Sequence, residues 1–78
     1  MGRLKVYPDL GIVQRLDEVM TQHGSDSQWG ARLECDRKTV LAYRHGDTDI
    51  PATRLKRICL ITGVNAQWLI FGEGEKYE

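Results

Sequence analysis

The most informative part of this sequence is QWGARLECDRKTVLAYRHG, residues 28–46. One continuous helix cannot explain it, because its small and apolar residues do not keep a single helical period. Two short helices that meet at a turn around residues 34–36 do explain it. Gly30 then lies where the two helices come closest, since a larger side chain would push them apart. This arrangement is a helix-turn-helix, with a predicted core of Trp29, Gly30, Leu33, Cys35, Val40 and Tyr43.

Capping residues and glycines around this stretch predict five helices in all. Asp9, Ser25, Asp36 and Asn65 are good N-cap residues, and Ser25 with Gln28 forms an S-x-x-Q capping box. Glycines are expected to end four of the helices. The first predicted helix ends at Gly24, and the second opens at Ser25. The third runs from Asp36 to about His45. The fourth starts at Pro51 and ends at Gly63, and the last covers residues 66–71. No segment alternates with period 2, so the predicted class is all-α, a compact five-helix bundle.

The 78 residues are enough for one small domain, with 41% apolar and 28% charged residues. No apolar run approaches the roughly 20 residues that span a bilayer, and no secretory signal is recognisable, so a cytoplasmic location is expected. Cys35 and Cys59 are too few for a disulfide framework and are predicted to be buried, reduced thiols. With His23 and His45 they lack the spacing of metal ligands, so neither a metal nor another cofactor is expected.

Eleven basic and eleven acidic residues cancel, which by itself argues against a nucleic-acid partner. Their distribution argues the other way. Residues 32–57 contain seven basic and four acidic residues, a net charge of +3, while both flanking parts are slightly acidic. A charge asymmetry of this kind can orient a protein on DNA.

The second helix of the motif has an inner and an outer face. On a helical wheel that starts at Asp36, Val40 and Tyr43 lie on the inner face. The opposite face carries Arg37, Lys38, Leu41, Ala42 and His45. In a helix-turn-helix, the N-terminal end of this helix reaches the base edges in the major groove. The residues predicted to read bases are therefore Arg37, Lys38, Leu41 and Ala42.

These assignments have alternatives. Arg37 is well shaped for two hydrogen bonds to guanine, but it can also be a solvated charge or a phosphate contact. Base reading and phosphate contact are equally open for Lys38. Leu41 suits a thymine methyl group, yet a single exposed leucine is common on protein surfaces. Ala42 is small enough to let the helix sit against a base pair.

Phosphate contacts are expected on both sides of these residues. The preceding helix should cross the DNA backbone, so the amides near Ser27 and the side chain of Gln28 are candidates. Asp26 opposes such a contact unless its carboxylate turns away. At the other end of the motif, Arg44 and His45 are expected to contact phosphates.

The segment TGVNAQWLIFGEGE, residues 62–75, is very similar to the Trp-Leu-x-x-Gly-Glu-Gly signature of one family. With the motif core, the chain from about Leu10 to Glu75 resembles the helix-turn-helix domains of temperate-phage repressors of the CI type. The resemblance implies a lambda-repressor-like fold and the repression of transcription by binding a double-stranded DNA operator. It also implies phosphate contacts from Thr48, Thr53 and Arg54, for which capping and solvation are the alternative. The family often has glycine where this chain has Glu34, so Glu34 either accepts a positive φ or changes the turn.

The expected organisation is an N-terminal arm over residues 1–8, a DNA-binding domain over residues 9–72, and an acidic tail or the start of a linker over residues 73–78. Arg3 and Lys5 in the arm are candidates to follow a DNA groove, although the start of the chain can also be a cloning remnant. The resemblance favours the N-terminal part of a longer repressor over a complete small regulator.

A short last helix cannot bury all of Trp68, Leu69, Ile70 and Phe71. Trp68 and Leu69 are expected to pack on the fourth helix. Ile70 and Phe71 then become the candidate contact of a weak homodimer, which would set two recognition helices about 34 Å apart on an inverted-repeat operator. One exposed apolar residue without any dimer is the alternative.

An enzyme is not expected, because the sequence has no nucleophile with a spaced base and no phosphate-binding glycine loop. The main rival is a protein-binding module of the same fold, or an antitoxin-like regulator, and the zero net charge favours it. A steep loss of DNA affinity with rising salt would separate the two hypotheses.

Overall fold

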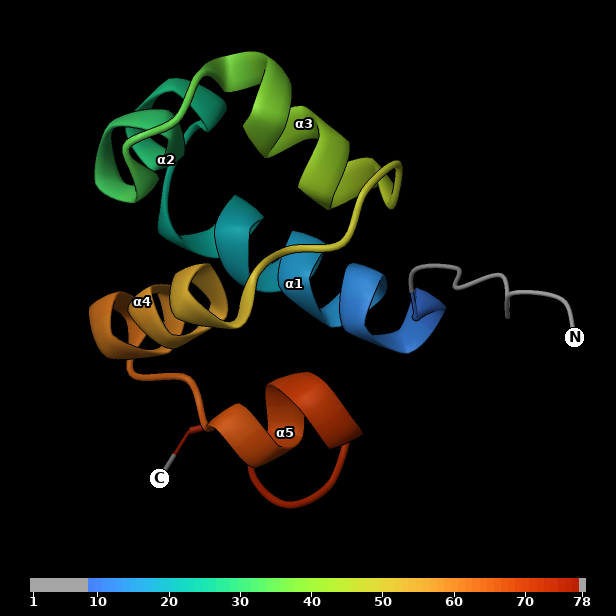
Figure 1. Ribbon diagram of the computed structural model, residues 1–78. Coiled ribbons are helices and arrows are strands. Elements are labelled where there is room, and N and C mark those ends of the chain that lie inside the picture. Colours follow the sequence, from blue (N-terminus) through green and yellow to red (C-terminus); the bar gives the residue numbers. More distant parts are fainter. Residues whose placement is uncertain (1–8, 78) are drawn as a thin grey trace, which may run out of the picture.

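The computed structural model describes residues 9–77, which form five helices (Figure 1). These are α1 (Leu10–His23), α2 (Asp26–Leu33), α3 (Arg37–His45), α4 (Ala52–Thr62) and α5 (Ala66–Phe71). Among the described residues, the only β-type pairing is an isolated bridge between Val64 and Tyr77. The predictions of an all-α class and of five helices are confirmed.

The predicted caps explain where the helices begin. Asp9 accepts a hydrogen bond from the amide of Ile12, and both bonds of the capping box between Ser25 and Gln28 are present. Pro51 differs slightly from its prediction, because it precedes α4 as the N-cap and the first helical residue is Ala52. Its extended backbone, with ψ at 149°, turns the chain into the helix.

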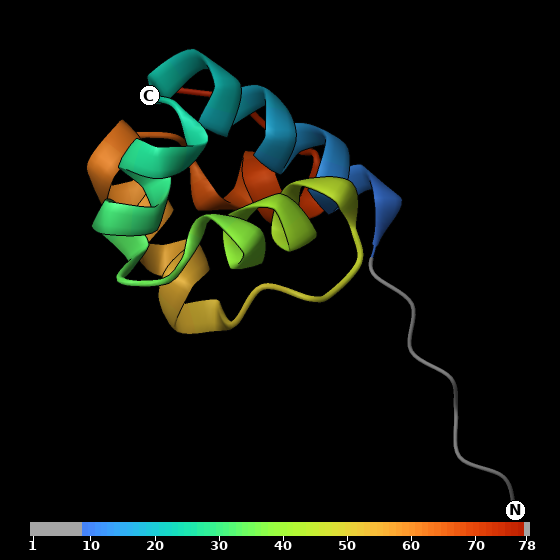
Figure 2. The same cartoon turned by 90° about the horizontal axis from the view of Figure 1, so that it is seen from above.

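Helix α1 lies at the centre of the molecule. Figure 1 shows it crossing the middle of the fold, with α2 and α3 on one side and α5 on the other. The view from above shows the loop from α3 to α4 running along the outer edge of the bundle (Figure 2). The core contains residues of all five helices, and the indole of Trp29 donates a hydrogen bond of 2.9 Å to the carbonyl of Met20.

Helix α5 packs mainly on α1, whereas the sequence led us to expect α4 as its neighbour. Arg15 of α1 explains this position, because its guanidinium donates hydrogen bonds of 2.8 and 3.1 Å to the carbonyls of Leu69 and Ile70. Leu69 is fully buried, and Trp68 packs partly buried against the core. One of Ile70 and Phe71 was expected to stay exposed; Phe71 is exposed, whereas Ile70 is half-buried.

The residues after α5 fold back onto the domain. The amide of Asn65 donates a hydrogen bond of 2.8 Å to the carbonyl of Lys76. The ammonium group of Lys76 lies 2.5 Å from a carboxylate oxygen of Glu18, and the hydroxyl of Tyr77 lies 2.8 Å from Nε2 of His23. The segment expected to be an acidic tail or a linker start is thus held against α1 up to Tyr77.

The sequence predicted an N-terminal arm and no membrane-spanning segment. The proposed arm, with Arg3 and Lys5, lies outside the described residues. Within residues 9–77, no helix has both the length and the apolar character needed to cross a membrane.

Candidate nucleic-acid interface

Helices α2 and α3 meet at a tight turn, and Gly30 is the residue that permits their close approach. It is buried, and the amide of Cys35 donates a hydrogen bond of 2.9 Å to its carbonyl. A Cβ atom on Gly30 would lie 2.9 Å from the carbonyl oxygen of Cys35, closer than such contacts normally are. The prediction that this position has no room for a side chain is confirmed.

Glu34 supplies the left-handed residue in this turn. Its φ is 57° and its ψ is 45°, and it is the only residue other than glycine with a positive φ in the described part of the chain. Glu34 therefore accepts the conformation for which glycine is usually preferred, at a cost of about 1 to 2 kcal/mol. Its carboxylate lies 2.8 Å from the guanidinium of Arg57 on α4.

The predicted motif core is buried, with one difference. Trp29, Gly30, Leu33, Val40 and Tyr43 are buried, whereas Cys35 is half-buried and packs against the others. Cys35 and Cys59 are free thiols, as predicted, but both are only half-buried. Burial raises the pKa of the Cys59 thiol, which favours its neutral form.

The outer face of α3 begins with two exposed cations. The side chain of Arg37 is 66% exposed, and Lys38 and His45 are exposed as well. Leu41 and Ala42 are half-buried, so their side chains project less far from α3 than the exposed cations beside them.

Asp36 fixes the start of α3 by accepting hydrogen bonds from the hydroxyl and the amide of Thr39. The side-chain hydrogen bond, followed by the backbone one, lowers the pKa of Asp36 below its ordinary value. Its ionised carboxylate therefore stabilises the helix N-terminus at neutral pH.

Arg44 differs most from its prediction. Its side chain is only 16% exposed, and its guanidinium donates hydrogen bonds to Asp17, Asp26 and Thr21. Because Nε, Nη1 and Nη2 each have a partner within the fold, Arg44 joins α3 to α1 and α2 and is not presented as a phosphate contact. No local sequence signal reveals these partners, since they lie 18 to 27 residues away along the chain.

The first turn of α2 lies beside α3, as the predicted interface requires. Nη2 of Arg37 is 3.9 Å from Asp26, whose carboxylate turns toward Arg44, so its negative charge is compensated. Ser27 and Gln28 are exposed next to it. The side-chain carbonyl oxygen of Gln28 accepts a hydrogen bond from the backbone amide of Ser25, the N-cap residue. The NH₂ group of the Gln28 side chain therefore remains able to donate a hydrogen bond to another group.

The start of α4 flanks α3 from the other side. Nη1 of Arg54 donates a hydrogen bond of 2.5 Å to the hydroxyl of Tyr43, which raises the pKa of Arg54 and holds its side chain near α3. Thr53 in the same turn and Thr48 in the preceding loop are exposed.

Several of the basic residues between residues 32 and 57 form ion pairs or hydrogen bonds within the domain. Arg44 is paired as described, Arg57 pairs with Glu34, and Arg32 donates to the carbonyl of His23 while lying over the ring of Trp29. In contrast, Lys38 has no acidic partner within residues 9–77. The first turn of α3 therefore exposes two adjacent cations, Arg37 and Lys38, and Lys56 on α4 is a further exposed cation without an acidic partner in this part of the chain.

The scan against protein-family models, the search of curated proteins and the search of solved structures each find no match. Among the described residues, no three His, Cys, Asp or Glu side chains are grouped as metal ligands would be. The function is therefore inferred from the residues and their geometry.

Proposed function

We propose that this chain binds double-stranded DNA in a sequence-specific manner, as a helix-turn-helix domain with a lambda-repressor-like fold. The observation that carries the proposal is the arrangement of α3, which is anchored through Val40 and Tyr43 and exposes Arg37 and Lys38 at its first turn. A helix anchored on one face and cationic at its N-terminus suits insertion into the major groove. The role that fits this activity is operator binding by a phage-type transcriptional repressor in the cytoplasm of a bacterial host.

Base reading is assigned to the outer face of α3. Arg37 is well placed to donate two hydrogen bonds to guanine, because its distance of 3.9 Å to Asp26 leaves the guanidinium free to turn outward. Lys38 beside it adds a second donor. Leu41 and Ala42 offer a low apolar surface to a thymine methyl group.

Phosphate contacts are assigned to the residues that flank this face. They come from the first turn of α2, from the end of α3, and from the loop and first turn that follow it. The assigned residues are Ser27, Gln28, His45, Thr48, Thr53 and Arg54. Arg44 is left out of this set because its donors are used within the fold.

A protein-binding module is the second candidate, and one observation favours it. Leu60 on α4 is 75% exposed and borders an apolar pocket, which is a feature of protein interaction sites. The pocket is lined by residues of α4 and α5 and by none of the residues assigned to base reading on α3.

Selection of bound sequences from a random duplex pool, with the affinity for the selected duplex measured against salt, tests the proposal. We expect an enriched consensus and a steep loss of affinity as salt rises. Lys38→Ala should weaken binding and, where it contacts a phosphate, reduce the salt slope by about one. Lys56→Ala removes the same charge from α4 and serves as the matched control, with binding unchanged. Salt-dependent binding without an enriched sequence would reject sequence specificity, and binding that does not depend on salt would reject DNA binding and leave the protein-binding module.

A further inference from the structure

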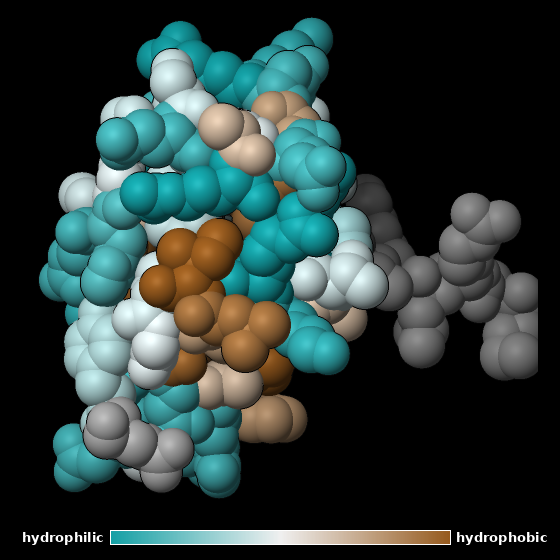
Figure 3. Space-filling view, turned by 90° about the vertical axis from the view of Figure 1, so that its left-hand side faces the viewer, coloured by the Kyte–Doolittle hydropathy of each residue, from teal (hydrophilic) through white to brown (hydrophobic). Residues whose placement is uncertain are grey.

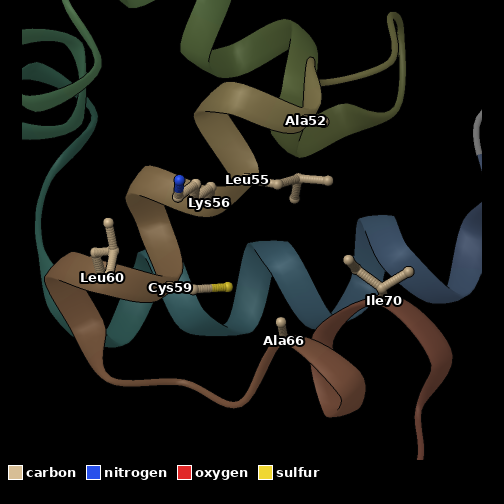
Figure 4. A pocket seen from close by; sticks show the side chains of 7 residues that line it. All are labelled: Ala52, Leu55, Lys56, Cys59, Leu60, Ala66 and Ile70. Carbon is tan, nitrogen blue, oxygen red and sulfur yellow. The ribbon is translucent and has the colours of Figure 1, made fainter.

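An apolar pocket of about 220 Å³ lies between α4 and α5. Figure 4 shows Leu55 and Cys59 of α4 on one side of it and Ala66 and Ile70 of α5 on the other. Its remaining lining residues are Ala52, Lys56 and Leu60.

The pocket arises from the way α5 is attached to the domain. The guanidinium of Arg15 donates hydrogen bonds to the carbonyls of Leu69 and Ile70, which hold α5 on α1 rather than close against α4. Two lining residues, Ala52 and Ala66, have side chains too small to fill the space that remains. Apolar walls left in contact with water favour the binding of an apolar group that displaces the water.

The lining restricts the chemistry of a ligand. Six of its seven residues are alanine, leucine, isoleucine or cysteine, and none of the seven has a carboxylate, hydroxyl or amide side chain. Burial raises the pKa of the Cys59 thiol, so this side chain adds no charge at neutral pH. A sugar, a nucleotide or a free amino acid would place polar groups against walls that cannot pair with them. The body of the ligand is therefore apolar.

Lys56 is the one charged residue of the lining, and it determines the polar end of the ligand. It is exposed and has no acidic partner in the described part of the chain. Its flexible stem allows the ammonium group to pair with an anion at the mouth of the pocket. Figure 3 shows apolar side chains gathered on the face where α4 ends, bordered by hydrophilic ones, so an apolar and a polar environment adjoin there.

The size and the shape of the pocket favour a chain over a ring. An apolar cavity of about 150 Å³ can bind benzene, so this pocket holds a larger body. Its lining on α4 runs from Ala52 to Leu60, which corresponds to about 12 Å along the helix axis. An extended aliphatic chain matches such an elongated site.

We propose that the pocket binds a medium-chain fatty acid, with the aliphatic chain between α4 and α5 and the carboxylate paired with the ammonium group of Lys56. A site of this kind, with apolar walls and one placed polar group, is typical of small-molecule binding. The ligand is small and the pocket is open on one side, so we expect a dissociation constant on the order of 0.1 mM. The proposal does not depend on DNA binding, and it is tested without DNA.

A titration with octanoate, followed by amide NMR spectra of the isotope-labelled protein, is the first measurement. Up to about 5 mM octanoate, we expect saturable shifts of the amides of Cys59, Ala66 and Ile70. Octan-1-ol has the same chain without the charge and should bind more weakly, and octylammonium, which Lys56 repels, should bind least. No saturable shift with octanoate, or equal binding of octanoate and octylammonium, would overturn the proposal.

Substitutions at Lys56 test the polar end of the site. Lys56→Met keeps the apolar stem and should weaken octanoate binding by about threefold to tenfold, while the binding of octan-1-ol stays the same. Lys56→Arg keeps the charge and should bind octanoate nearly as the parent does. An unchanged affinity of Lys56→Met for octanoate would show that the carboxylate does not pair with this lysine.

Filling the pocket tests the apolar end. Ala66→Phe places a ring in the space between α4 and α5 and should abolish the binding of both octanoate and octan-1-ol. Ala31→Phe makes the same change on the exposed surface of α2 and should leave both unchanged. In the ligand-free protein, shifts of the pocket amides on dilution, or Overhauser contacts between the pocket and residues 1–8, would show that a second copy or the chain itself occupies this space, contrary to the proposal.

Discussion

Nη1 of Arg44, in the last turn of α3, donates a hydrogen bond of 2.5 Å to Oδ1 of Asp26, in the first turn of α2. The same guanidinium reaches Asp17 and Thr21 of α1, so one residue joins three helices. Burial by itself lowers the pKa of Arg44, but the hydrogen bonds to the two carboxylates outweigh it and the pKa lies above its ordinary value. Arg44 therefore stays charged at neutral pH.

Replacement of Arg44 should destabilise the domain. Arg44→Ala leaves two carboxylates without their partner, and we expect a loss of about 1 to 3 kcal/mol in the free energy of unfolding. Arg44→Lys should lose less, because it keeps the charge but not the planar group that reaches several acceptors. Urea unfolding measures both, with His45→Ala on the exposed neighbouring position as the control. Equal stability of Arg44→Ala and the control would show that the network does not stabilise the fold.

Enlarging Gly30 should disturb the close approach of α2 and α3. Gly30→Leu is expected to cost at least about 1 to 3 kcal/mol, because the new side chain meets the backbone carbonyl of Cys35. Ala31→Leu makes a similar addition one position further on, at an exposed site, and should change little. Thermal unfolding followed by circular dichroism compares the two variants. A midpoint of Gly30→Leu no lower than that of the parent would mean that the two helices do not meet at this residue.

A substitution at Glu34 is expected to stabilise the domain, in contrast to those at Arg44 and Gly30. Glu34→Gly relieves the left-handed strain and loses only an exposed ion pair with Arg57, so we expect a gain of about 0.5 kcal/mol. Glu34→Ala keeps the strain and should be about 1 kcal/mol less stable than the glycine variant. Ala31→Gly inside α2 is the control, and there glycine should destabilise by about 0.5 to 1 kcal/mol. A glycine variant at position 34 that is less stable than the alanine variant would contradict the assigned backbone conformation.

Arg37 provides the test of base reading. Arg37→Ala should cost about 1 to 3 kcal/mol of specific binding and relax the preference at one base position of the selected operator. Thr48→Ala, which removes a proposed phosphate contact, should weaken all sequences alike. Repeating the selection with each variant separates the two effects. An unchanged consensus and affinity for Arg37→Ala would remove the outer face of α3 from the proposed interface.

The parts of the fold that the sequence predicted well depend on neighbouring residues. Asp36 caps α3 through Thr39, three positions along, and the capping box of α2 spans the same distance. The restriction at Gly30 follows from the two short helices on either side of it. Such features can be predicted from the sequence because the interacting groups lie within one or two helical turns of each other along the chain.

The parts that it did not predict depend on contacts between distant segments. Arg15 holds α5 on α1 over more than 50 residues of chain, and Lys76 reaches Glu18 over a similar distance. Arg44 was assigned to DNA because it is basic and near the end of α3, and only its partners on other helices give it a structural role. A residue type and its local spacing do not reveal such partners.

The strained turn at Glu34 also bears on how this chain can change. Codons for glutamate and glycine differ by one nucleotide, so the relaxed turn is a single point mutation away. A chain that keeps Glu34 is then below its stability optimum, as expected when selection removes only variants that fall under a threshold. That one mutation would be a compensating change, because the stability it adds could offset the destabilisation caused by a new side chain elsewhere on the surface of the domain.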